Sequence, residues 1–84
     1  MTKKEFIKEF QDVAKVLFLD RGDKNPSDKA LAWFGVCLKS VESGVFDRNE
    51  VIRGLKRLLV SDKKFLNIGD LLSEIRKERV LEIS

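Results

Sequence analysis

The sequence predicts an all-α fold, a compact bundle of four helices in a single domain that covers residues 1–84. The main observation is a helix-opening signal, in which a short polar residue is followed three positions later by an acid. The polar side chain accepts from the free amides of the first turn, and the acid is attracted to the positive helix end. This signal occurs as Thr2 with Glu5, Asn25 with Asp28, Asp47 with Glu50, and Asn67 with Asp70.

The second observation is the spacing of the apolar residues, which has the helical period of about 3.6 and lacks the alternation of a strand. Together with the caps, this spacing predicts helices at about residues 3–19, 26–42, 48–60 and 68–80. Beyond residue 80 the period weakens, and three outcomes stay open. The last few residues fray, dock as a final apolar turn, or precede further chain.

The first predicted helix has the clearest apolar stripe. Its inward positions are Phe6, Ile7, Phe10, Val13, Ala14, Leu17 and Phe18. Gly22 predicts the end of this helix, because glycine readily adopts the left-handed backbone that terminates many helices. Pro26 then fits the first position of the second helix, where no amide hydrogen is needed.

The second predicted helix has a wider apolar face, and we expect it to be the central helix. The face consists of Ala30, Leu31, Trp33, Phe34, Cys37, Leu38 and Val41. Trp33 is expected in the core rather than at a partner surface. Glycine weakens a helix interior by about 1 kcal/mol relative to alanine, so we expect another backbone to pass close to Gly35.

The third and fourth predicted helices are each preceded by an aromatic residue. Phe46 comes directly before the Asp47 cap and is placed to pack on Val51. Phe65 and Leu66 precede the next cap, and both are expected to be anchored in the core. The inward positions that follow are Val51, Ile52, Leu55, Leu58 and Leu59 in the third helix, and Leu71, Leu72 and Ile75 in the fourth.

The residue types exclude most catalytic chemistry. The chain has no histidine and a single cysteine, so the usual zinc sites and an internal disulfide cannot form within it. No phosphate-binding loop, dinucleotide fingerprint or nucleophile motif is present. We therefore expect no enzyme activity, no metal and no cofactor. Cys37 lies on an apolar helix face, where cysteine is usually a small buried hydrophobic residue with a raised pKa.

The net charge of +3 is unevenly distributed. Five basic residues lie in a stretch that contains one acid, Asp62. They form the predicted basic edge, which consists of Arg53, Lys56, Arg57, Lys63 and Lys64. Such an edge can bind nucleic-acid phosphates or an acidic protein surface. We favour the plainer interpretation, a solvated helix face followed by a lysine-rich loop, because such basic patches are common.

Three apolar residues fall at or beyond the edges of the predicted stripes, namely Val16, Leu19 and Phe46. Exposed apolar side chains of this kind are candidates for contact with another protein, so we predict them as interface residues. Self-association through such a strip is an open alternative. No apolar run is long enough for a membrane span or a signal peptide, which predicts a cytoplasmic protein.

The order of these features resembles the folded N-terminal helical domain of the phage replicative-helicase loader and inhibitor family. The resemblance covers roughly residues 3–77 and consists of Phe6, Phe10, Trp33, Val51, Leu55, Leu59, Phe65, Asn67, Ile68, Gly69, Asp70 and Leu71. The family usually has proline after the aromatic residue and threonine or serine at the cap. Leu66 and Asn67 stand at these positions here and keep the same physical roles.

The resemblance implies a small adaptor for phage DNA replication, located in the host cytoplasm. Such an adaptor binds the hexameric replicative helicase, restrains it and passes it to an origin-bound initiator. Family members also have a flexible tail that contacts the helicase, whereas the present sequence ends at Ser84. The alternative function is sequence-independent DNA binding by the basic edge of the third helix and the loop that follows it.

Overall fold

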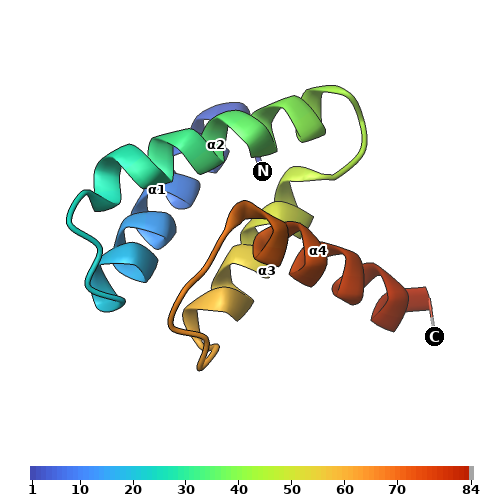
Figure 1. Ribbon diagram of the computed structural model, residues 1–84. Coiled ribbons are helices and arrows are strands. Elements are labelled where there is room, and N and C mark those ends of the chain that lie inside the picture. The colour runs from blue at the N-terminus through green and yellow to red at the C-terminus, as the bar shows by residue number, and fades with distance from the viewer. Residues whose placement is uncertain (84) are drawn as a thin grey trace.

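The computed structural model describes the backbone of residues 1–83 and the side chains other than those of Glu78 and residues 80–83. Four helices occur in this part of the chain: α1 (Lys3–Asp20), α2 (Pro26–Glu42), α3 (Arg48–Leu59) and α4 (Ile68–Ile83) (Figure 1). Residues 1–83 contain no strand, so the predicted all-α fold is confirmed. α4 continues beyond its predicted end at residue 80, and Ser84 lies outside the described residues.

α3 and α4 begin with reciprocal caps, as predicted. The amide of Asp47 donates to Glu50 Oε1 over 2.9 Å, and the Asp47 carboxylate accepts from the first turn of α3. At α4 the amide of Asn67 donates to Asp70 Oδ2 over 2.8 Å, while Asn67 Oδ1 accepts from the amide of Asp70 over 3.1 Å. Each pair gives partners to amides that the helix leaves free, so these two helix starts are determined locally.

The starts of α1 and α2 differ from each other. Thr2 Oγ1 accepts from the amide of Glu5 over 3.1 Å, which confirms the predicted cap of α1. The predicted cap of α2 is wrong, because the side chain of Asn25 makes no capping hydrogen bond. The backbone amide of Asn25 donates to Asp23 Oδ1 over 3.1 Å. Pro26 begins the helix with a backbone that is already near the helical conformation, which explains why α2 starts without the cap.

α1 packs between α2 and α3, and α3 also packs on α4. The predicted central position of α2 is therefore wrong, because α1 and α3 are the helices with two major neighbours. α1 and α3 run in the same direction. Arg48 Nη1 donates to the carbonyl oxygen of Met1 over 3.2 Å near their starts, and Lys56 forms an ion pair with Glu9 further along. In Figure 1 the α1–α2 hairpin lies beside the α3–α4 pair.

Aromatic side chains fill the core between α1 and α2. The buried rings of Phe6 and Phe10 pack against Phe34 with centroid separations of 5.7 Å and 5.5 Å. Phe18 meets Trp33 edge to face at 4.8 Å. Trp33 is 6% exposed, so its predicted core position is confirmed. α3 and α4 extend the core with Val51, Ile52, Leu55, Leu58, Leu71 and Ile75.

A close approach between two helices occurs at Gly54 and not at Gly35. A Cβ atom at Gly35 would meet nothing within 4 Å, so the predicted backbone contact there is wrong. At Gly54 a Cβ atom would lie 2.6 Å from Ile75 Cγ1 and 3.3 Å from the Ile75 backbone nitrogen. Glycine at this position thus lets α3 and α4 cross closely. Leu31 is 62% exposed, which shows that the buried face of α2 is narrower than predicted.

Candidate protein-binding surface

Two lysines of the predicted basic edge form ion pairs with acids on neighbouring helices. Lys56 Nζ lies 3.1 Å from Glu9 Oε1 of α1, and Lys63 Nζ lies 2.6 Å from Asp70 Oδ1 of α4. The hydrogen bond from Lys63 and the one from the amide of Asn67 hold the pKa of Asp70 below its ordinary value. Much of the positive charge at this edge is therefore compensated within the chain.

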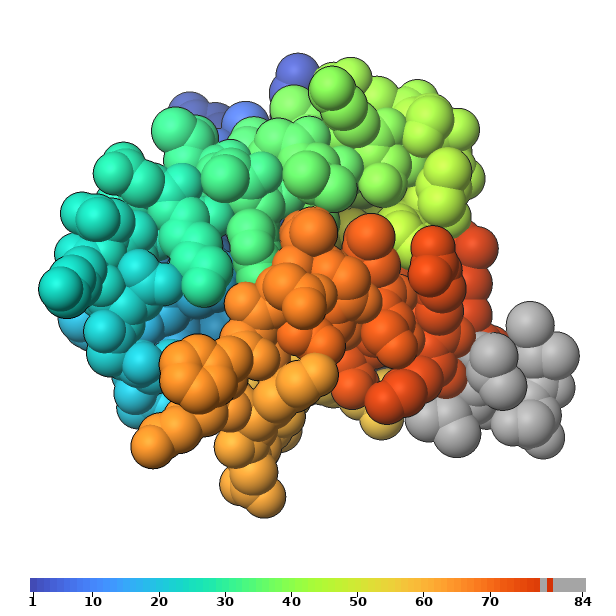
Figure 2. Space-filling model, in the orientation of Figure 1, coloured from blue at the N-terminus to red at the C-terminus, as the bar shows by residue number. Residues whose placement is uncertain are grey.

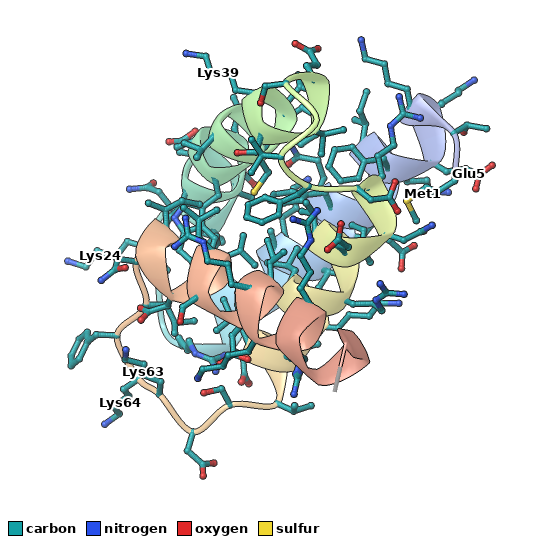
Figure 3. The ribbon with its side chains drawn as sticks, turned by 90° about the vertical axis from the view of Figure 1, so that its right-hand side faces the viewer. Met1, Glu5, Lys24, Lys39, Lys63 and Lys64 are labelled. Atoms are coloured by element: carbon teal, nitrogen blue, oxygen red, sulfur yellow. The ribbon has the colours of Figure 1, made fainter. Side chains whose placement is uncertain are left out.

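The remaining basic-edge residues lie in different surroundings. Arg57 Nε is 3.8 Å from Glu74 of α4. The pKa of Glu50 is lowered mainly by the hydrogen bond from Arg79. The positive charge of Arg53 lowers it to a smaller extent. Figure 3 shows Lys63 and Lys64 on the loop between α3 and α4, with Lys24 on the same side of the molecule. The five residues therefore follow α3 and its loop without forming one uncompensated basic patch.

Of the three apolar side chains that were predicted as interface residues, one is buried and two are exposed. Phe46 is 5% exposed, and Arg79 Cζ lies 5.5 Å from the centroid of its ring. Its predicted interface role is wrong, because the ring packs in the same buried cluster as Val51, as the residue before a cap commonly does. Val16 and Leu19 are 54% and 67% exposed. Both are therefore accessible to a partner, as the prediction of an interface requires.

Phe65 is the most exposed large apolar side chain among the described residues, at 87%. Its predicted core position is wrong, and Leu66, which is 8% exposed, is the anchor before α4. The reciprocal cap at Asn67 fixes the direction of the chain, so only the residue directly before the cap faces the core. Val60, at the end of α3, is 82% exposed and was not singled out by the sequence.

Arg21 connects the end of α1 to the loop between α3 and α4. Its Nη2 donates to the carbonyl oxygens of Leu58 over 2.8 Å and Ser61 over 2.7 Å, and its Nε donates to that of Lys63 over 2.9 Å. The side chain is 10% exposed. Gly22 follows with a φ of 75°, which confirms the predicted left-handed end of the helix. No sequence pattern indicated this role of Arg21, because its partners are backbone carbonyls about 40 residues away.

Arg21 brings together the segments that bear the most exposed apolar side chains of the described chain. Leu19 precedes it in α1, Val60 adjoins its partner Ser61, and Phe65 lies in the loop just after its partner Lys63. We call these three exposed residues, Leu19, Val60 and Phe65, on the segments that Arg21 joins, the apolar end. The loop of this end lies at the bottom of Figure 1, and it projects from the body of the molecule in Figure 2.

A hollow of about 200 Å³ opens beside Phe65. Its lining comes from the end of α1, the first turn of α2 and the loop before α4, and consists of Phe18, Arg21, Gly22, Asp23, Lys29, Lys64, Phe65 and Leu66. Phe18 and Leu66 are themselves buried, so the hollow has an apolar base. Phe65 forms an exposed wall.

The charged groups of the hollow are mostly positive. Lys29 Nζ lies 3.2 Å from Asp23 Oδ2 and 4.9 Å from the centroid of the Phe18 ring. Asp23 accepts from the amide of Asn25 and from Lys29, and these hydrogen bonds lower the pKa of its carboxyl group. Lys64 has no acid partner among the described residues. The lining therefore contains three cations and one carboxylate.

Burial raises the pKa of the Cys37 thiol to about 12, so the cysteine is a buried apolar residue, as predicted, and not a thiolate at neutral pH. The described residues include no group of three or more histidine, cysteine, aspartate or glutamate side chains placed to hold a metal ion. None of the described helices has the length and apolar character needed to cross a membrane.

Comparisons with protein-family models, with curated proteins and with solved structures found no match for this chain.

Proposed function

We propose that this protein is a small non-enzymatic adaptor that binds a partner protein through the apolar end. One observation carries the proposal. The three most exposed large apolar side chains of the described chain, Phe65, Val60 and Leu19, lie on segments that Arg21 holds together. Isolated exposed apolar residues are common on soluble proteins, but several of them on segments that are joined to each other are what an interaction surface requires.

Burial of these side chains would supply substantial binding energy. Removing a leucine, valine or phenylalanine side chain from water contributes about 1.5 to 3 kcal/mol. Aromatic residues are also frequent among the few side chains that dominate the affinity of a protein interface. Phe65, with its large exposed ring, is therefore the expected anchor of the contact.

The loop that carries Phe65 is held in place before any partner binds. Arg21 donates to the carbonyl oxygens of Ser61 and Lys63 on one side of it, and the reciprocal cap at Asn67 holds the other. Ordering a loop upon association costs free energy, so a loop that is already fixed binds more tightly than a mobile one. This arrangement favours a role of the loop in recognition.

The partner that we propose is a replicative helicase, which makes the protein a phage helicase loader or inhibitor-like module. This choice is based on the resemblance in residue order, and the observed helical arrangement is compatible with it. The resemblance includes Phe65 and the capped start of α4. In this protein, Phe65 is at the surface, which makes it available for contact with the helicase.

Sequence-independent DNA binding is less well supported. Affinity for DNA depends on the number of cations that meet phosphates. Lys56, Arg57 and Lys63 instead lie within ion-pair distance of Glu9, Glu74 and Asp70. Each acid would repel a nearby phosphate.

The test is capture of partners from a host lysate on the immobilised protein, with and without nuclease, followed by titration with purified replicative helicase. We expect a saturable complex with a protein that survives nuclease treatment. The double variant Arg53→Glu with Lys56→Glu shows whether the basic edge contributes, and we expect it to keep most of the binding. Loss of all capture after nuclease treatment, together with tight and steeply salt-dependent DNA binding, would support the alternative instead.

A further inference from the structure

We propose that the hollow beside Phe65 receives a large apolar side chain from an acidic segment of the partner protein. This inference rests on the proposed function, because it specifies the chemistry that the adaptor recognises. It is carried by the position of the hollow within the apolar end, by its apolar base and by the excess of positive charge in its lining.

The size and the walls of the hollow suit a single side chain. Its volume of about 200 Å³ is below the range of about 300 to 1,000 Å³ that is usual for small-molecule sites. Phe18 and Leu66 form a base that is apolar and already packed. The ring of Phe65, being exposed, can cover an aliphatic or aromatic group placed on that base.

The charges of the hollow favour an acid next to that side chain. Arg21, Lys29 and Lys64 line it, whereas Asp23 is the only carboxylate among the lining residues. Asp23 is paired with Lys29. The guanidinium of Arg21 donates to backbone carbonyls and lies 3.9 Å from Asp20 Oδ2, within ion-pair distance. Lys64 is therefore the lining cation without an acid partner among the described residues. A carboxylate beside Lys64 would therefore be attracted.

These features favour a peptide over a nucleic acid. An extended nucleic acid presents a row of phosphates and requires a row of cations. Beyond the hollow on the same loop, Lys63 is paired with Asp70, and Asp62 adds a further negative charge. An acidic peptide segment needs only one or two cations next to an apolar contact.

The experiment is an NMR titration of the intact protein with synthetic peptides of equal length. The first peptide has a leucine and a phenylalanine flanked by aspartates, the second has lysines in place of the aspartates, and the third keeps the aspartates but has serines in place of the apolar pair. Oligothymidine is the fourth probe. We expect the first peptide to shift the amide signals of Gly22, Asp23 and Leu66, and to bind at least about tenfold more tightly than the others.

Two single variants test the residues. Phe65→Ser removes the apolar wall and Lys64→Glu reverses the unpaired charge, and each is expected to weaken binding of the first peptide about tenfold. Both residues are exposed, so the fold should be retained, and circular dichroism checks this. The matched controls are Val36→Ser and Lys39→Glu on the exposed side of α2, which should leave the affinity unchanged.

Equal binding of the acidic and basic peptides, preferred binding of oligothymidine, or absence of shifts at the hollow would each overturn the inference. The failure of this inference and that of the proposed function are distinguishable. A partner protein that binds the Phe65→Ser variant more weakly but the Lys64→Glu variant as tightly as the native chain would leave the apolar end as the binding surface and overturn the recognition of an acidic segment at the hollow.

Discussion

The guanidinium of Arg21 donates a 2.7 Å hydrogen bond to the carbonyl oxygen of Ser61, and through it the end of α1 is joined to the loop that follows α3. Carbonyl groups at the end of a helix lack partners within the helix, so an arginine that reaches them replaces water. This contact connects parts of the chain that are distant in sequence. It also fixes the backbone around Val60 and Phe65, whose apolar side chains are the most exposed among the described residues.

Replacing Arg21 by lysine is expected to destabilise the fold by about 2 to 3 kcal/mol, measured by urea denaturation. A lysine ammonium cannot reproduce the planar fork that donates to the carbonyls of Leu58, Ser61 and Lys63. The control is Lys24→Ala, an exposed residue of the neighbouring turn, which should change the unfolding free energy by less than about 0.5 kcal/mol. Equal effects of the two variants would contradict the role assigned to Arg21.

Alanine at Gly54 and alanine at Gly35 should have opposite effects on stability. At Gly54 the new methyl group would clash with Ile75 and force α3 and α4 apart, at a cost of about 1 to 3 kcal/mol. At Gly35 the space is open, so alanine should stabilise α2 by up to about 1 kcal/mol. Thermal and urea denaturation of both variants measures the difference. A stabilising Gly54→Ala would show that the two helices do not cross as described.

Replacing the residue before the helix should lower the unfolding free energy at α3 and leave it nearly unchanged at α2. Asp47→Ala deletes a side chain that accepts from the first turn of α3, and it should cost about 1 kcal/mol. Asn25→Ala deletes a side chain with no capping bond, so its effect should be within about 0.5 kcal/mol. Denaturant unfolding of the two variants compares them directly. A larger loss for Asn25→Ala than for Asp47→Ala would be inconsistent with the observed helix starts.

Stability should fall in acid because two capping acids have lowered pKa values. The main cause of the lowered pKa of Glu50 is hydrogen bonding from Arg79, and the main cause of the lowered pKa of Asp70 is the hydrogen bond from Lys63. A lowered folded-state pKa stabilises the fold above the unfolded-state pKa of about 4, and this stabilisation is lost as the pH falls through the folded-state pKa. We expect the melting temperature to be nearly constant from neutral pH to about pH 5 and to decrease below about pH 4.

The variant Glu50→Gln assigns part of this acid sensitivity to one group. At neutral pH this variant should be less stable than the native protein. In acid its stability should approach the native value, because Glu50 is then protonated in both the folded and the unfolded state. Asp62→Asn, at an exposed loop residue without an ion pair in the described chain, is the control and should leave the pH profile unchanged. A difference between Glu50→Gln and the native protein that is independent of pH would disprove the linkage.

The helices could be predicted from the sequence because their signals are local. The caps at Asp47 and Asn67 and the stripe that contains Phe6 and Phe10 involve residues within a few positions of each other. The order of packing could not be predicted in the same way. Gly35 and Gly54 both lie inside helices. Only the crossing of α3 and α4 places Gly54 against Ile75, while Gly35 faces open space.

The candidate surface was predicted only in part. Leu19 was identified because it falls outside the apolar stripe of its own helix, which is a local property. The side-chain directions of Phe46 and Phe65 depend on how the chain enters the following helix. Phe65 was predicted in the core and is exposed, whereas Phe46, which was predicted both to pack on Val51 and to reach a partner, is buried in the cluster that contains Val51. Arg21 was missed because its partners are backbone carbonyls of a distant loop, and such acceptors have no sequence pattern.

The most direct test of the account is the affinity of the captured partner protein for a variant in which the apolar end is made polar. The variant combines Leu19→Ser, Val60→Ser and Phe65→Ser. Its matched control changes three other exposed apolar residues, Leu31→Ser, Val36→Ser and Val45→Ser. We predict that the first variant keeps its helical circular dichroism and binds at least about tenfold more weakly, and that the control keeps the native affinity. Native affinity in the first variant, or an equal loss in both, would contradict the assignment of the apolar end as the binding surface.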